Sequence, residues 1–378
     1  MSIIRFQNRA KLGIFAYFAK NLIEMVVEKD IVAVSIPFLA GVMTAALLPP
    51  GCDALVWTGA GACLAAGGLL VAAAGRGPRA AVLTALFWVL GVLCQVSAAL
   101  APAPQGPWPP TERALAGLLG AIDAADFPHA DTGALLKALL AGRREGLDAA
   151  TVAAFREAGA SHILALSGLH LGILYAILQG ALAWLGRSRA ATVVRSAMSV
   201  AAAGFFLLMT GASPSLVRAF LFICLGELSR LLPGRRRSPA GIFFAALTLQ
   251  LAVAPGVVSS LGFQLSYLAL LGIVLVFPRL EAWYPAGHRA DPVRRIWSAM
   301  ALTLSCQLFT APLVWLRFHT FPACFLLTNL GALPLTEGFI LCALPALLPG
   351  CPDAIKNLAD GIGQALLHFL ETVAAISP

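Results

Sequence analysis

Long apolar runs recur along most of the chain and are separated by short polar segments. A helix needs about 20 mainly apolar residues to cross the hydrocarbon core of a bilayer. The pattern therefore predicts membrane spans, which we place at 31–48, 54–74, 80–100, 162–185, 190–211, 214–232, 240–257, 263–280 and 296–316. Residues 321–348 predict either one long span or a re-entrant piece followed by a span. Residues 360–376 predict a weaker helix that either crosses the membrane or lies on its surface.

These elements predict an all-α membrane bundle of about ten spans, with re-entrant or broken helices among them. Composition supports this fold class, because 59% of the residues are hydrophobic, only 12% are charged, and the mean hydropathy is +0.85. Soluble domains carry about 25% charged residues, and a soluble fold of this length could not bury so much apolar surface. A lipid bilayer removes that difficulty, since it solvates apolar side chains.

Basic residues alternate between the connecting segments and so predict the orientation of the chain. Cytoplasmic loops are enriched in Lys and Arg, and with the N-terminus inside, every Arg-rich loop falls inside. The residues concerned are Arg76, Arg79, Arg187, Arg189, Arg230, Arg235, Arg236, Arg237, Arg289, Arg294 and Arg295. The pattern predicts a multi-pass protein of the bacterial cytoplasmic (inner) membrane with a cytoplasmic N-terminus. It also accounts for much of the net charge of +8.

The spans divide the chain into five predicted parts. Residues 1–30 form a basic amphipathic segment, without the features of a cleavable signal peptide, that either lies on the inner membrane surface or is a fortuitous extension. Residues 31–100 hold three spans, 101–160 an external linker, 161–350 the membrane core, and 351–378 a C-terminal helix. The linker opens with a Pro-rich stretch and predicts short amphipathic helices near 113–122, 132–141 and 148–159.

Polar residues within the apolar runs are costly and therefore mark candidate functional positions. In a continuous helix, His170 would lie about 12 Å deeper than His162, and Ser167 would share its face. Most of these groups fall in the outer half of the membrane, where they outline a hydrated vestibule. The candidate pathway residues are Ser167, His170, Arg218, Gln264, Ser266 and Asn329.

Helix starts give this vestibule a positive character. Ser213 is a suitable N-cap, Pro214 suits the first turn, and Arg218 adds a full charge one turn further. Helix N-termini carry partial positive charge, so an anionic solute would be attracted. Each group also has a structural alternative: Arg218 could reach lipid phosphates, and Ser167, His170, Gln264 and Asn329 could bond neighbouring helices.

Cofactor and hydrolase chemistry receive little support from the sequence. The eight Cys include no CxxC pair, and no Cys/His spacing suits zinc, so we expect no cofactor and no metal. An intramembrane serine hydrolase using Ser167 and His170 is disfavoured, because two residues three apart on one helix cannot easily align nucleophile and base. We therefore expect no enzymatic activity.

Four sequence blocks in order carry a family resemblance. Residues 139–172 read LLAGRREGLDAATVAAFREAGASHILALSGLHLG, and TGASPSLVRAF (210–220), SSLGFQLSYLALLGI (259–273) and LTNLGALPL (327–335) follow. Over about 135–350 the chain resembles the ComEC-type competence family. The resemblance implies an inner-membrane channel for uptake of single-stranded DNA during natural transformation, with 161–350 as its core.

The same resemblance implies partners and missing parts. Members of the family work with an external DNA receptor, a cytoplasmic helicase-like motor and a nuclease, and a small bundle could need to form a homodimer to pass a strand. Many add an OB-like domain and a metallo-β-lactamase-like domain. Where relatives carry the OB-like domain, this sequence has only residues 101–160, and it has no HxHxD run typical of the metallo-β-lactamase-like domain. We therefore expect a short form that depends on a separate nuclease.

Two alternatives remain at this stage. A small-solute or lipid transporter would show a buried carboxylate beside a broken helix, and Glu337 lies near Gly331 and Pro334. A degenerate paralogue is the other alternative. The DNA interpretation is weakened by segment 101–160, which holds seven acidic against five basic residues and is therefore not a strongly basic funnel.

Overall fold

The computed structural model describes residues 28–47, 59, 79–99, 109–231, 238–284, 291–319 and 323–376. All regular structure in these ranges is helical, which confirms the all-α membrane fold. Five helical stretches are long and apolar enough to cross a membrane, and three shorter apolar helices accompany them. The predicted segments 1–27 and 54–74 lie outside the described residues, apart from Gly59.

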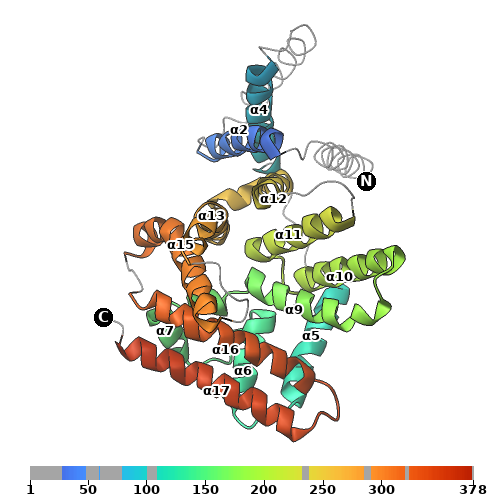
Figure 1. Ribbon diagram of the computed structural model, residues 1–378, viewed down its shortest axis with the longest axis vertical. Coiled ribbons are helices and arrows are strands. Elements are labelled where there is room, and N and C mark those ends of the chain that lie inside the picture. Colours follow the sequence, from blue (N-terminus) through green and yellow to red (C-terminus); the bar gives the residue numbers. More distant parts are fainter. Residues whose placement is uncertain are drawn as a thin grey trace. The chain divides into compact units, whose positions relative to one another are not determined.

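Figure 1 colours the helices in chain order from blue to red. Their bounds are α2 (Glu28–Ala46), α4 (Arg79–Ala99), α5 (Pro109–Ala124), α6 (Ala130–Ala141), α7 (Ala149–Glu157), α8 (Ser161–Leu164), α9 (Gly168–Ala181), η1 (Ala183–Leu185), α10 (Arg189–Met209), α11 (Pro214–Leu231), α12 (Pro239–Val253), η2 (Pro255–Ser259), α13 (Leu261–Leu275), α14 (Phe277–Glu281), α15 (Pro292–Phe318), α16 (Phe325–Ala346) and α17 (Asp353–Ile376). They fall into two compact units, one of residues 1–105 with 221–267 and the other of 106–220 with 268–378.

In the first unit, α2 and α4 cross where each helix has a glycine. A Cβ atom on Gly41 would collide with the carbonyl of Trp88, and one on Gly91 with the carbonyl of Phe38. Small residues allow such backbone contact between membrane helices. Helix α12 packs beside α2, where the Thr248 hydroxyl donates to Ser35 Oγ at 2.7 Å, so a hydrogen bond joins two otherwise apolar faces.

The second unit is built on a hairpin of α16 and α17, which lie side by side at the red end of the chain in Figure 1. Helices α6 and α7 pack against α17, and α5 packs on α6 and joins the same core through Ile122. Leu135, Leu139 and Phe339 are among the fully buried side chains of the shared core. At the end of α7, the Thr328 hydroxyl of α16 donates to the Ala158 carbonyl at 2.6 Å.

The prediction of one continuous helix over 162–185 is wrong. A single turn, α8, ends at Leu164, the backbone is extended at Ala165 and Ser167, and α9 begins at Gly168. Ser167 is an N-cap residue, which favours an extended backbone rather than a place within a helix. The 12 Å helical spacing between His162 and His170 therefore does not apply.

Of two further predicted elements, one is divided and the other is a continuous helix. The run 263–280 divides at Val276 into α13 and α14. Pro278 in the first turn of α14 has no N–H to donate to the carbonyl of Val274, four residues earlier. Residues 325–346 form one continuous helix, α16, which passes through Gly331 and Pro334 without a break. The long-helix alternative for 321–348 therefore holds over these residues.

Candidate functional site

The break before α9 places a serine and a histidine in contact around a helix start. The backbone N–H of Ser167 donates to Nδ1 of His170 at 3.2 Å. This bond satisfies an amide that the helix itself leaves unpaired, and it resembles a capping box in which histidine replaces the usual Glu or Gln. The imidazole is held in place by its own helix.

The hydrogen bond at Nδ1 decides which ring nitrogen of the His170 imidazole carries the hydrogen. A neutral histidine has one donor and one acceptor nitrogen. Since Nδ1 accepts the Ser167 N–H, we assign the proton to Nε2. The His170 side chain is fully buried, and Nε2 has no hydrogen-bond partner among the described residues. The first turn of α9 thus presents a buried, unused N–H donor, and burying such a group costs free energy unless a partner is supplied.

Arg218 of α11 lies against the same helix start. A Cβ atom on Gly168 would lie 3.4 Å from Nη2 of Arg218 and 3.0 Å from Cβ of Ala219. A side chain at this position would press on Ala219, so the glycine favours this close approach. The structure therefore brings together three of the predicted pathway residues, Ser167, His170 and Arg218, around the N-terminal ends of α9 and α11.

The remaining predicted pathway residues are Asn329, Gln264 and Ser266. Asn329 is in the first turns of α16, and its Oδ1 atom is also buried without a partner among the described residues. Gln264 and Ser266 belong to the part of α13 that lies in the first unit. Gln264 donates its amide to the Val258 carbonyl at 2.9 Å, which ties α13 to η2. That bond favours the structural alternative for Gln264.

The serine–histidine pair has the geometry of a helix cap. Ser167 Oγ lies 3.5 Å from Nδ1 of His170, which is the limit of a hydrogen bond. The shorter contact to Nδ1 comes from the backbone N–H of the same serine. An imidazole nitrogen that already accepts a backbone N–H is poorly placed to take a proton from Oγ.

A buried carboxylate on α17 forms a second polar cluster that the sequence analysis missed. Asp360 accepts hydrogen bonds from the His129 backbone N–H at 3.1 Å and from the Thr132 hydroxyl at 2.6 Å. His129 Nδ1 lies 2.8 Å from the other carboxylate oxygen, and Gln364 donates to Thr132. The carboxylate lies at the N-terminus of α6, where negative charge is favoured.

The protonation of Asp360 follows from these contacts. Burial by itself raises the pKa of the Asp360 carboxyl, but the hydrogen bonds from Thr132 and His129 outweigh it, and the net pKa is lowered. The local sequence carries little sign of this cluster, because 231 residues separate its two sides. The one available signal was an acidic residue on the otherwise apolar stripe of an amphipathic helix.

Comparison with known proteins places the chain in a family. A sequence model of the competence protein family matches residues 139–377, which is more than half of the chain. The chain belongs to the competence protein family. This match confirms the resemblance drawn from the four sequence blocks. It covers the α9–α11 site and Asp360, whereas His129 and Thr132 lie before its first residue.

A longer protein is similar to this chain over part of its length. The chain is 26% identical over 244 residues to ComE operon protein 3 of Bacillus subtilis (strain 168). The alignment covers 64% of this chain but 29% of that protein, so the chain spans less than a third of the length of this relative. No solved structure matches the chain.

Proposed function

We propose that this chain is an inner-membrane channel subunit for single-stranded DNA during natural transformation, and that the N-terminal ends of α9 and α11 bind its phosphodiester backbone. The observation that carries the proposal is the buried Nε2–H of His170, a fixed donor without a partner in the described residues. Membership of the competence protein family supports DNA as the ligand. The name of the Bacillus relative points to the same process.

The chemistry of this site suits a phosphodiester. Each nucleotide of a strand carries one negative charge, and proteins that bind strands without sequence preference follow that charge with basic groups. A phosphate oxygen accepts hydrogen bonds from a guanidinium, an imidazole N–H and helix N-terminal amides. Arg218 at Gly168 and the donor nitrogen of His170 supply the first two, and the start of α9 supplies the third.

The channel has a fixed orientation and works with other proteins. The N-terminus is cytoplasmic, as the Arg-rich loops indicate. An external receptor delivers the DNA, a separate nuclease removes the second strand, and a cytoplasmic helicase-like motor pulls the first. Pairing of two copies would widen the path. The chain itself needs no cofactor for this role.

The transporter alternative finds less support. Helix α16 is continuous at Gly331 and Pro334, where that alternative expected a break, and Glu337 is exposed. The buried carboxylate of Glu227 in α11 pairs with Arg230 one turn away at 2.8 Å. A carboxylate neutralised by its own helix is a weak candidate for a coupling-ion site.

DNA uptake in cells tests the proposal. A strain lacking this gene would carry the wild type, Arg218→Ala, His170→Ala or, as a control, His368→Ala, which alters an exposed histidine of α17. The measurement is conversion of labelled DNA to a nuclease-protected state inside the cell, at matched protein abundance. We expect the wild type and His368→Ala to restore uptake and the two site variants to lose most of it. Normal uptake in the deletion strain would reject the proposal.

A further inference from the structure

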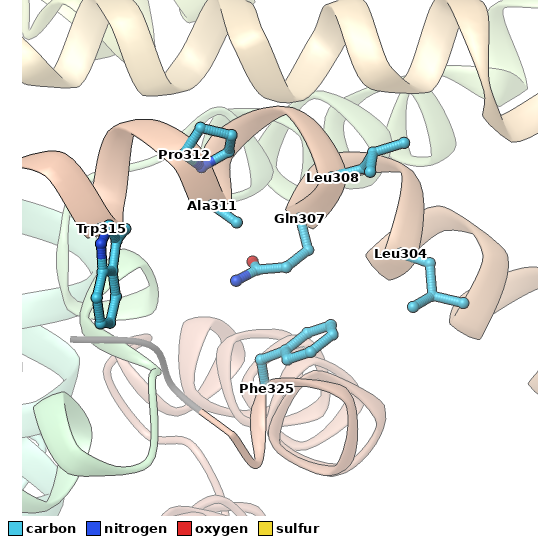
Figure 2. A pocket seen from close by; sticks show the side chains of 7 residues that line it. All are labelled: Leu304, Gln307, Leu308, Ala311, Pro312, Trp315 and Phe325. Atoms are coloured by element: carbon cyan, nitrogen blue, oxygen red, sulfur yellow. The ribbon is translucent and has the colours of Figure 1, made fainter. Parts of the chain in front are cut away.

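An open groove of about 720 Å³ lies between α15 and the first residue of α16. Its lining is almost wholly apolar and consists of Leu304, Gln307, Leu308, Ala311, Pro312, Trp315 and Phe325. Figure 2 shows the Trp315 and Phe325 rings projecting into the same space from the two helices. The Trp315 side chain is 57% exposed, so one of its faces is available for a ligand.

One amide interrupts this apolar lining. The Gln307 side chain extends from α15 into the groove, and its amide lies between the two aromatic rings in the view of Figure 2. Within the part of the chain that the structure describes, this amide makes no hydrogen bond. A polar group in an otherwise apolar pocket commonly fixes the orientation of a bound molecule.

A proline among the lining residues changes the hydrogen bonding of α15. Pro312 lies inside α15 and has no N–H, so the carbonyl of Leu308, four residues earlier, lacks its normal helical donor. The groove thus combines two aromatic rings with an amide, on a helix whose Leu308 carbonyl has lost its normal donor. A flat heterocycle with hydrogen-bonding edges matches this set, because its faces stack on aromatic rings while its edges bond polar groups.

We propose that this groove is a nucleobase subsite of the channel, in which Trp315 and Phe325 contact the faces of a base and the Gln307 amide bonds its edge. The inference rests on the proposed function, because it takes the DNA strand as the substrate. Arg317 is exposed two residues beyond Trp315, where it can meet the phosphate that follows the bound base. Stacking is tolerant of sequence, as uptake of unrelated DNA requires.

A lipid acyl chain is the competing occupant. Of the candidate spans in the described residues, α15 has the smallest buried share, and an acyl chain would fill an apolar groove. It would, however, cover the Gln307 amide without offering it a hydrogen bond, which is unfavourable. A base satisfies the same amide. The groove therefore fits a base better than a hydrocarbon chain.

Paired oligonucleotides separate contacts to bases from contacts to phosphates. The full chain would be placed in nanodiscs of phosphatidylethanolamine and phosphatidylglycerol. Fluorescence anisotropy would then measure binding of a labelled oligothymidylate and of an abasic strand of equal length. We expect Trp315→Ala and Phe325→Ala to raise the Kd for oligothymidylate about fivefold or more and to leave the Kd for the abasic strand unchanged. Trp315→Phe keeps a ring and should bind nearly as the wild type does.

The controls distinguish this inference from the proposed function. Trp184→Ala removes a tryptophan that is 81% exposed in η1 and should change neither affinity. Equal weakening of both strands in the groove variants, or unchanged affinities together with loss of co-purified phospholipid, would overturn the base subsite and leave the channel standing. Wild-type protein that binds neither strand would overturn both proposals.

Discussion

Two buried polar side chains at helix starts have opposite surroundings. The carboxylate of Asp360, a residue of α17, lies at the beginning of α6 and accepts hydrogen bonds from His129 and Thr132. His170 lies in the first turn of α9, and its Nε2 receives none among the described residues. A satisfied buried group stabilises the fold, whereas an unsatisfied one is retained at a cost. This contrast favours a structural role for Asp360 and supports the proposed role of His170 in ligand binding.

Removal of the Asp360 carboxylate should destabilise the second unit. Asp360→Ala leaves the His129 amide and the Thr132 hydroxyl without their acceptor, and we expect a loss of about 2 kcal/mol in unfolding free energy. Thermal denaturation in detergent measures it. Asp353→Ala is the matched control, since this carboxylate lies on the same helix and its side chain is 90% exposed. Equal melting temperatures for Asp360→Ala and the wild type would contradict the structural assignment.

The same carboxylate predicts a pH dependence. Because the pKa of Asp360 is lower in the folded chain than its ordinary value, its stabilising contribution is full above that ordinary pKa. The contribution is lost as the pH falls through the lower, folded-state pKa. The difference in melting temperature between wild type and Asp360→Ala should therefore shrink on acidification. A difference that grows at acidic pH would show that the sign is wrong.

A pair of substitutions at His170 separates its capping role from its donor role. Both Gln and Glu serve as the third helical residue of a capping box, so either side chain can accept the Ser167 N–H. Only Gln also keeps an N–H donor, while Glu places a negative charge where a phosphate would bind. We expect His170→Gln to retain much of the DNA uptake and His170→Glu to lose it, with both proteins present in the membrane. Full uptake with Glu would exclude the donor role.

At the scale of elements, hydropathy predicted where helices form but not where they stop. The amphipathic stretches expected near 113–122, 132–141 and 148–159 correspond to α5, α6 and α7. The break between α8 and α9 was missed because Ala165 and Leu166 are apolar. Hydropathy averaged along the chain does not reveal an N-cap residue. Ser167, with a hydrogen-bonding side chain three residues later, was the local signal.

The candidate site was predictable in part, because local sequence marks its residues but not their contacts. Polar residues within apolar runs marked Ser167, His170 and Arg218, and the structure brings these three together. Which of them touch depends on how α9 packs on α11, and that information is spread over the whole unit. The pairing of His129 with Asp360 is likewise a product of tertiary packing.

The packing of α9 on α11 predicts a matched pair of glycine variants. A side chain at Gly168 would press on Ala219 and on the Arg218 guanidinium, whereas a Cβ atom on Gly172, one turn further along α9, has nothing within 4 Å among the described residues. We expect Gly168→Leu to abolish DNA uptake and Gly172→Leu to preserve it. The readout is protected DNA per cell at equal membrane abundance. Similar loss in both variants would mean that the close approach is not needed.

At the scale of the whole molecule, segment 109–164 does not stand apart from the membrane core of its unit. Its helices share a buried core with α16 and α17, from Thr328 at one end to Ala359 at the other. Helix α16 is a candidate membrane span, so the packing ties a mostly amphipathic segment to a membrane helix. The hydropathy pattern predicts an external linker with short helices, and these helices share a buried core with a membrane helix.

This shared core predicts that the starts of α6 and α17 lie on the same side of the membrane. Asp360 cannot bond His129 across a bilayer, so exposed positions beside each of them must face one aqueous compartment. In a cysteine-free background, Asp131→Cys and Asn357→Cys should both react with a membrane-impermeant maleimide added to one side, and neither from the other side. Both positions are exposed. If they react from opposite sides, the α6–α17 cluster does not exist in the membrane.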